Sequence, residues 1–210
     1  MEAIKSAFAW NNGGIWMWFI CAVSVGCLAL LTERIYYIFF KFNTNARQLM
    51  DAVQRNVIQN NIDGAVQVCN AARTSAVARV VKAGLGRADR SQLEIQNAIE
   101  EATLEVVPEV TRFLPTLASL ANIATLLGLL GTIIGLISAF EALESATPDK
   151  RQEMLASGIA IAMNTTAFGL IVAIPTLLFH TILSVTAKNI LDSIELCSTK
   201  VGNLLSQRAK

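Results

Sequence analysis

The sequence of 210 residues is 53% hydrophobic and 16% charged, and its mean hydropathy of +0.49 lies well above that of a typical soluble domain. The 17 Lys and Arg residues nearly balance the 16 Asp and Glu residues, so no excess of positive charge points to nucleic acid. Composition and charge therefore indicate an integral membrane protein and argue against a nucleic-acid-binding one.

Three apolar blocks divide the chain, and each is long enough to cross a bilayer. They predict transmembrane helices at residues 15–31, 114–143 and 157–185. The remaining parts are an N-terminal segment (1–14), a large loop (32–113), a short loop (144–156) and a tail (186–210). The first block lacks a small-residue cleavage site and is followed at once by basic residues, so we expect a retained anchor rather than a removed signal peptide.

The distribution of Lys and Arg near the spans predicts the orientation. Only Lys5 precedes the first block, whereas several basic residues follow it directly and the tail is also basic. The large loop and the tail are therefore expected to be cytoplasmic, and the N-terminal segment and the short loop to lie outside. Three tryptophans at the outer end of the first block are expected to act as interfacial anchors: Trp10, Trp16 and Trp18.

Helical periodicity dominates the large loop, and no strand pattern is convincing anywhere. Leu49, Val53 and Val57 repeat at helical spacing, and Ser91 with Glu94 forms a capping box that opens an amphipathic helix. This helix is expected to continue across Pro108 into the second span, with a kink. The predicted fold is an all-α membrane protein with three transmembrane helices, a large helical cytoplasmic region, and long helices that extend from the second and third spans.

The second and third spans each carry a face of small residues at helical spacing. Small residues let helix backbones approach closely in a membrane. On the second span the face consists of Ala121, Ala124, Thr125, Gly128, Gly131, Thr132, Gly135, Ser138 and Ala142. On the third span it consists of Ala162, Thr166, Gly169 and Ala173, with Asn164 and Thr165 beside it and a bend expected at Pro175.

Thr132 and Thr166 are expected to lie at the same depth. The two spans run antiparallel, and each threonine stands about 15 Å from the outer end of its span, at 1.5 Å per residue. Their hydroxyls are therefore predicted to meet. A single threonine in a span most often has a structural role only, in which its hydroxyl donates to the carbonyl four residues back. Because two threonines at matching depth lie on two small-residue faces, a structural role and a role in transport are here about equally supported.

Catalytic and metal-binding patterns are missing from the sequence. The lone His180, near the inner end of the third span, is more typical of interfacial packing than of a ligand or a base. No cofactor, metal or disulfide is expected, and the four cysteines (Cys21, Cys27, Cys69 and Cys197) form no framework. The cores of the second and third spans also lack Asp, Glu, Lys and Arg, so an ion pathway would need a carboxylate from a partner.

Two segments carry a family resemblance. LLGLLGTIIGLISAF in the second span, together with GIAIAMNTTAFGLIVAIPT in the third, resembles the MotA/TolQ/ExbB family of ion-driven motor stators, and LLTERIYYIFF after the first span agrees with it. Three spans are similar to the TolQ and ExbB type, since MotA-type subunits have four. The resemblance covers essentially the whole chain.

This resemblance implies a bacterial inner-membrane protein with a periplasmic N-terminus. It implies a homopentamer around a TolR/ExbD-like dimer of single-span proteins, each with a membrane Asp, and a TonB- or TolA-like force transmitter as a further partner. Thr132 and Thr166 would be lumen hydroxyls near that Asp, with Thr165, Asn164 and Thr125 as further polar positions of the ion pathway. The load would be import across the outer membrane, envelope constriction or gliding.

The sequence departs from the family pattern at two positions. Ile161 stands where many members carry Glu, which argues against an acidic relay on this chain, and Thr125 stands where a Pro is common. The extra hydroxyl raises sodium as an alternative to the proton, which is the default ion. Other classes stay open: a passive three-span scaffold that oligomerises through its small-residue faces, and a solute transporter, for which inverted repeats are lacking.

Overall fold

The computed structural model describes residues 14–42, 46–145 and 147–208, and within them every regular element is a helix. Three helical stretches are long and apolar enough to cross a membrane: Ile15–Phe39, Gln92–Glu144 and Pro148–Gln207. The all-α fold class with three spans is therefore confirmed. By its internal contacts the chain divides into two units, residues 1–32 with 113–181, and residues 33–112 with 182–210.

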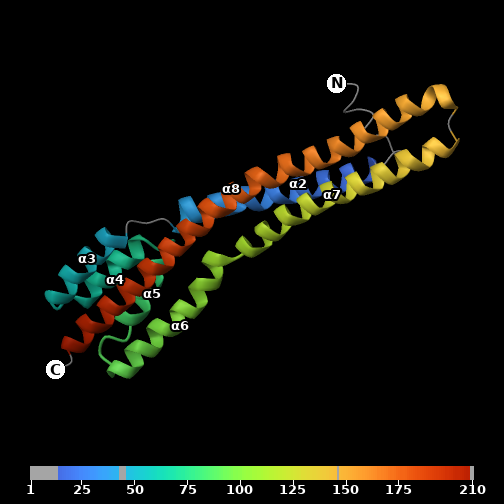
Figure 1. Ribbon diagram of the computed structural model, residues 1–210. Coiled ribbons are helices and arrows are strands. Elements are labelled where there is room, and N and C mark those ends of the chain that lie inside the picture. The colour runs from blue at the N-terminus through green and yellow to red at the C-terminus, as the bar shows by residue number, and fades with distance from the viewer. Residues whose placement is uncertain (1–13, 43–45, 146, 209–210) are drawn as a thin grey trace. The chain divides into compact units, whose positions relative to one another are not determined.

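The first unit contains most of α2 (Gly14–Ile35), α7 (Leu114–Ser145) and the first part of α8 (Pro148–Arg208). Figure 1 shows α7 and α8 running side by side from the turn that joins them. That turn is shorter than the loop expected at 144–156, because α7 reaches Ser145 and α8 begins at Pro148. Proline is favoured in the first helical turn, where its missing N–H costs no hydrogen bond.

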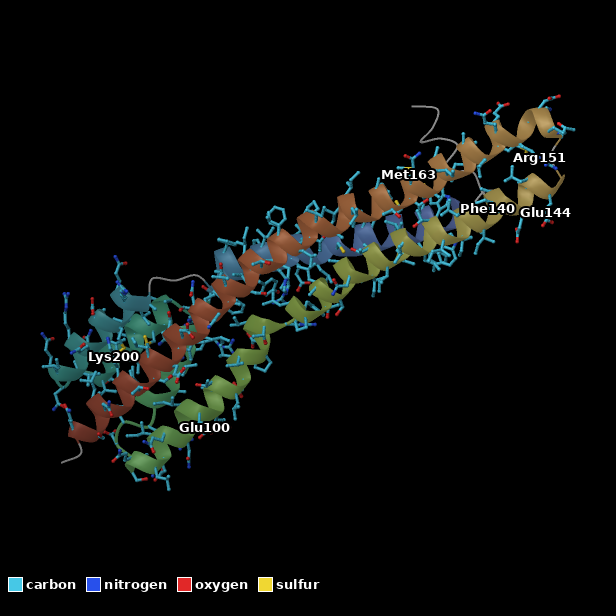
Figure 2. The ribbon with its side chains drawn as sticks, viewed as in Figure 1. Glu100, Phe140, Glu144, Arg151, Met163 and Lys200 are labelled. Carbon is cyan, nitrogen blue, oxygen red and sulfur yellow. The ribbon has the colours of Figure 1, made fainter. Side chains whose placement is uncertain are left out.

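Large apolar side chains cover the outer surface of the first unit. Leu126, Ile133 and Ile171 are at least half exposed, and so are Phe140 and Met163, which are labelled in Figure 2. Charged residues such as Glu144 and Arg151 gather instead at the turn between α7 and α8. An exposed apolar girdle with charges at its end is the surface expected of a helix pair in lipid.

The second unit contains η1, a π-helix (Tyr36–Phe42), and the helices α3 (Ala46–Ile58), α4 (Ile62–Ala71), α5 (Ala76–Leu85) and α6 (Gln92–Thr111), with the end of α8. α5 packs against α6 and α4, and α4 against α3. The stripe predicted on α3, Leu49, Val53 and Val57, is buried. Gly84 lets α5 approach its neighbours, since a Cβ there would lie 2.8 Å from Ile99 Cγ1.

The expected N-cap of α6 at Ser91 is confirmed. The Glu94 N–H donates to Ser91 Oγ over 3.3 Å, and the Ser91 hydroxyl donates to Glu94 Oε1 over 3.1 Å. The first of these bonds satisfies a backbone donor in the first turn of the helix, and the second joins the two side chains of the predicted capping box.

The expected continuation of this helix into the second span is wrong. α6 contains Pro108 without breaking, and the chain leaves the helix at Arg112 and Phe113, where Phe113 adopts a positive φ of 61°. Pro115 explains the position of the break: it has no N–H to donate to Thr111, and its ring clashes with that carbonyl in a continuous helix. α6 and α7 are thus separate helices.

Candidate functional site

The small-residue faces of α7 and α8 pack against each other, and their backbones nearly touch. A Cβ added at Gly128 would lie 3.3 Å from Thr166 Cα and 3.4 Å from Gly169 Cα. One added at Gly169 would lie 2.7 Å from the Ala124 carbonyl oxygen, and one at Gly135 would lie 3.0 Å from Ala162 Cβ. The small-residue faces of α7 and α8 are therefore in close contact within one chain.

Thr132 and Thr166 meet in this interface, as the depth argument predicts. Their hydroxyl oxygens are 3.0 Å apart, and both side chains are half-buried. Thr166 Oγ1 lies 2.9 Å from the Gly128 carbonyl across the interface, and Thr132 Oγ1 lies 2.7 Å from the Leu129 carbonyl on its own helix. The pair forms a polar point inside an otherwise apolar helix interface.

The other polar positions named from the sequence lie apart from this pair. Thr165 is buried and donates to the Ile161 carbonyl over 3.0 Å, and its side chain fills the space opposite Gly131. Thr125 donates to the Ala121 carbonyl over 3.2 Å, seven residues along α7 from Thr132. Asn164 is half-buried. The contribution of these three residues to an ion pathway stays a prediction.

Two further helix positions complete the description of these faces. Pro175 is exposed, and α8 continues through it to Arg208, so the bend expected at Pro175 stays a prediction. Gly158, which the sequence reading did not include, extends the packing face outward, because a Cβ there would clash with Ala139. Its spacing of four residues from Ala162 was the available signal.

The helix α2 completes the packing of the first unit. Ile20 of α2 forms a buried cluster with Ala124 of α7 and with Val172 and Ala173 of α8. Trp16, expected at the interface as an anchor, is half-buried, and its Cβ lies 3.5 Å from a Cβ placed on Gly131. Trp18 is 52% exposed, as suits an anchor, whereas Trp10 lies outside the described residues.

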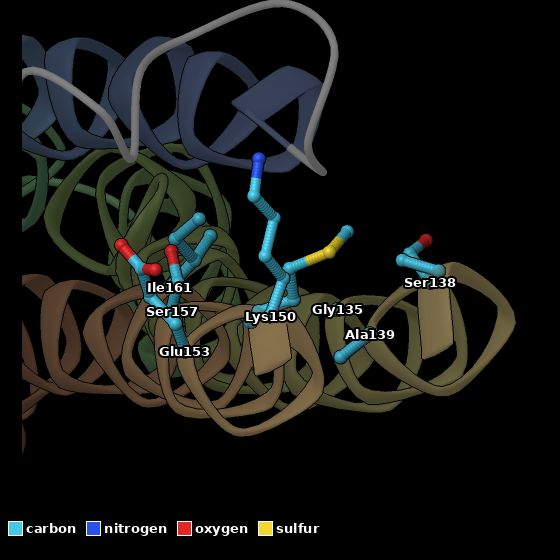
Figure 3. A pocket seen from close by; sticks show the side chains of 10 residues that line it. Gly135, Ser138, Ala139, Lys150, Glu153, Ser157 and Ile161 are labelled. Carbon is cyan, nitrogen blue, oxygen red and sulfur yellow. The ribbon is translucent and has the colours of Figure 1, made fainter. Parts of the chain in front are cut away.

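A cavity of about 420 Å³ opens between α7 and α8 toward their shared turn (Figure 3). Gly135, Ala139 and Gly158 form its apolar part, together with Ile161, and the polar side chains around it are those of Ser138, Ser157, Lys150 and Glu153. Gly135 is one helical turn from Thr132, and Ile161 is five residues from Thr166. The cavity therefore begins about one turn beyond the threonine pair.

The chemistry of this site is that of hydroxyls and backbone carbonyls. No Asp, Glu, Lys or Arg occurs between Phe113 and Phe140 or between Met154 and Ala187. Among the residues that the structure describes, no three His, Cys, Asp or Glu side chains are grouped to hold a metal. The site can therefore donate and accept hydrogen bonds, but it cannot itself carry a proton as a charged group.

Comparison with known proteins agrees with this arrangement. A search among curated proteins finds no match. The model of the MotA/TolQ/ExbB proton channel family matches residues 72–196, which include α5, α6, α7 and most of α8. This match covers more than half of the 210 residues, and the chain therefore belongs to the MotA/TolQ/ExbB proton channel family.

Proposed function

We propose that the chain is the inner-membrane subunit of an ion-driven motor, which assembles as a homopentamer around a TolR/ExbD-like dimer of single-span proteins. In this proposal a membrane Asp of the partner carries the ion, and its movement past the subunits turns one component within the other. The family is one of proton channels rather than of enzymes, and this chain has three helical stretches long and apolar enough to cross a membrane. The observation that carries the proposal is the contact between Thr132 and Thr166 inside spans that lack charged residues.

The two hydroxyls suit a carboxyl group that changes its protonation state. The two hydroxyls have two hydrogens to donate. The acceptors within reach are the carbonyls of Gly128 and Leu129 and the oxygen of the other hydroxyl. A rotation about the C–O bond turns either hydrogen from a carbonyl toward a carboxylate, whereas a protonated carboxyl donates to a hydroxyl lone pair. The pair thus lowers the cost of holding the partner's Asp in the membrane in both states.

The cavity beyond the threonine pair supplies an outer approach for the ion. It begins one helical turn from the pair and has Ser138, Ser157 and Glu153 along its polar side. Ile161, in the place where many relatives carry Glu, lines the same cavity, so the chain offers no acid between Glu153 and the threonines. We propose the proton as the ion, with sodium as the alternative that additional hydroxyls favour.

The orientation and the load belong to the same proposal. The N-terminus and the turn between α7 and α8 would be periplasmic, and the second unit and the C-terminus cytoplasmic, in agreement with the distribution of basic residues. The work would be outer-membrane import through a TonB-like protein, constriction through a TolA-like protein, or gliding. The competing proposal is a passive scaffold, which would oligomerise without a partner or an ion current.

The first experiment compares Thr166→Val with Thr181→Val in proteoliposomes that contain the chain and its single-span partner. Thr181 is exposed and donates only to the Leu177 carbonyl four residues back, so it is a matched control on the same helix. We expect ion flux to fall by roughly tenfold in Thr166→Val, because a hydrogen bond to a charged group is lost, and to stay unchanged in the control. Full flux in Thr166→Val would show that Thr166 has only a structural role.

The second experiment separates the motor from the scaffold. The chain is co-purified with the single-span protein encoded beside it, and the subunits are counted by native mass spectrometry. Five copies with two partner chains are expected. A monomer, or an oligomer that ignores the partner, would refute the motor proposal.

A further inference from the structure

The cavity beyond the threonine pair approaches that pair from one end of the helices, the end at the turn between α7 and α8. Toward the other end, where α7 begins at Leu114, the small-residue faces are in close contact, and a Cβ on Gly169 would lie 2.7 Å from the Ala124 carbonyl oxygen. An ion that passes the pair would therefore continue along the outer surface of a helix rather than between α7 and α8.

Asn122 is an exposed polar residue on that surface of α7. The next exposed residues along the helix are apolar, with Ile123 exposed by 42% and Leu126 by 63%. The Asn122 side chain makes no hydrogen bond with any residue that the structure describes. Its two N–H hydrogens and its carbonyl oxygen are thus available to groups outside the chain.

The packing of α2 against α7 places Asn122 near the middle of the membrane. Ile20 of α2 belongs to one buried cluster with Ala124 of α7, so these two residues lie at similar depth. The two helices run in opposite directions (Figure 1), and Asn122, two residues before Ala124, therefore lies at the level of position 22 in α2. The first apolar block extends over 15–31, so this level is roughly 10–14 Å from either end of it, at 1.5 Å per residue.

An amide at that depth does not suit a surface that faces lipid. Hydrocarbon offers no hydrogen bonds in exchange for those that the amide makes to water. Polar side chains within spans accordingly face a water-filled space or a polar group of another helix. The residues around Asn122 favour the first of these two surroundings.

Two hydroxyls stand three residues before and three residues after Asn122. Ser119 is exposed and donates to the Pro115 carbonyl over 3.1 Å, and Thr125 is half-buried and donates to the Ala121 carbonyl over 3.2 Å. Because these hydrogens are used within the helix, the two oxygens can still accept hydrogen bonds from water. Positions three apart are neighbours on a helix surface, so Ser119, Asn122 and Thr125 form a continuous polar track.

The polar track leads toward the threonine pair. Each step of three residues turns about 60° around the helix, so the track winds from the exposed Ser119 to the half-buried Thr125. Thr132 follows Thr125 by seven residues, which is nearly two full turns and returns to the same side of α7. A contact with one neighbouring helix would need a single polar residue, whereas a track of this length suits a row of water molecules.

We propose that the polar track is the second half of the ion pathway, between the threonine pair and the end of α7 at Leu114. This inference rests on the proposed motor function and adds Ser119 and Asn122 to the residues of the pathway. The Asn122 carbonyl oxygen would face the hydrated ion, and its N–H groups would hold the surrounding water. Asn122 is thus a positioning residue, and the charge of the ion is balanced by the partner's Asp.

The first test measures the access of water to single cysteines in the complex of the full-length chain with its single-span partner. The four native cysteines are replaced by alanine, and partner-dependent ion flux establishes that this complex is intact. Open membrane fragments are then treated with a trimethylammonium methanethiosulfonate, which does not enter lipid, and modification is read by mass. We expect Ser119→Cys and Asn122→Cys to be modified, and Ile123→Cys to be protected, since it lies at the same depth but about 100° around the helix.

The second test measures flux. Asn122→Leu removes the polar group at similar volume, and we expect ion flux to fall by roughly tenfold, as for the loss of one hydrogen bond along the pathway. Asn122→Ser retains a hydrogen-bonding group and should keep most of the flux, and Ile123→Leu, the control, should keep all of it. Native mass spectrometry shows whether Asn122→Leu still assembles with the partner.

Three results would overturn the polar track. They are protection of Asn122→Cys, equal modification of Ile123→Cys and Asn122→Cys, and wild-type flux in Asn122→Leu. A loss of assembly in Asn122→Leu would also refute it, because Asn122 would then join subunits. Any of these results together with a loss of flux in Thr166→Val would leave the motor in place, whereas a complex without partner-dependent flux would refute the motor itself.

Discussion

Replacement of Gly169 by alanine is expected to force α7 and α8 apart. The new Cβ would lie 2.7 Å from the Ala124 carbonyl oxygen and 3.1 Å from Gly128 Cα, and both are backbone atoms that no rotamer change can move. To restore an ordinary contact of 3.4 Å, the backbones must separate locally by about 0.7 Å. Thr166 stands one turn away, so its 3.0 Å contact with Thr132 is expected to stretch beyond hydrogen-bond range.

The magnitude follows from two opposing effects. Alanine is a better helix former than glycine by about 1 kcal/mol, which favours the variant. Overpacking of a close interface costs about 1–3 kcal/mol, which opposes it. Gly26→Ala on α2 experiences only the first effect, because nothing lies within 4 Å of its added Cβ. Gly169→Ala is therefore expected to be less stable than Gly26→Ala by about 1–3 kcal/mol.

The assay is unfolding of both variants in detergent micelles, followed by circular dichroism under identical conditions. Gly26→Ala should be at least as stable as the unmodified chain, and Gly169→Ala should be less stable than Gly26→Ala. Equal stability of the two variants would refute the close approach of α7 and α8. Flux measurements with the partner present would then show whether the threonine contact depends on that approach.

Two further predictions concern the second unit. Ser91→Ala removes the cap of α6 and is expected to lower the unfolding free energy by about 1 kcal/mol. Ser91→Asp keeps an acceptor for the Glu94 N–H and should therefore retain most of the stability that the cap provides. Thermal unfolding of both variants checks this, and equal losses of stability would contradict the cap. Burial raises the pKa of the Cys69 thiol to about 11, against the weaker opposing effect of Lys82. In a chain that retains Cys69 alone, alkylation at pH 8 should be much slower in the folded than in the denatured state, and equal rates would refute the burial. Since the unfolded thiol releases its proton near pH 9, this contribution to stability is complete below that pH and is lost as the pH rises to about 11.

Helical spacing and depth were sufficient to predict the centre of the site. Gly128, Gly135, Ala162 and Gly169 recur at the period of an α-helix, and in a membrane such faces have few uses besides close packing. Counting residues from the expected outer ends of the two antiparallel spans also predicts which positions face each other. The contact of Thr132 with its counterpart on α8 follows from that count alone, and its distance of 3.0 Å confirms it.

Features that depend on contacts between distant segments could not be predicted in this way. Arg34 is buried and donates to the carbonyl of Glu109, which is 75 residues away in sequence. The break at Phe113 was not predicted: a continuous helix with a kink at Pro108 was expected, although Pro115, which carries the same local signal, lies next to the observed break. The π-helical turn over 36–42 has no sequence signature that distinguishes it from an α-helix.

The packing of α7 directly onto α8 has a consequence for how copies of this chain can associate. The glycine faces are occupied within each chain, so a neighbouring copy would meet a surface of branched aliphatic side chains, such as Leu129, Ile133 and Ile174. Contacts between such side chains in lipid depend on shape complementarity and dispersion, because lipid tails are equally apolar. Mutational screens for assembly should therefore target these bulky residues, while glycine substitutions will report on the fold of the single subunit.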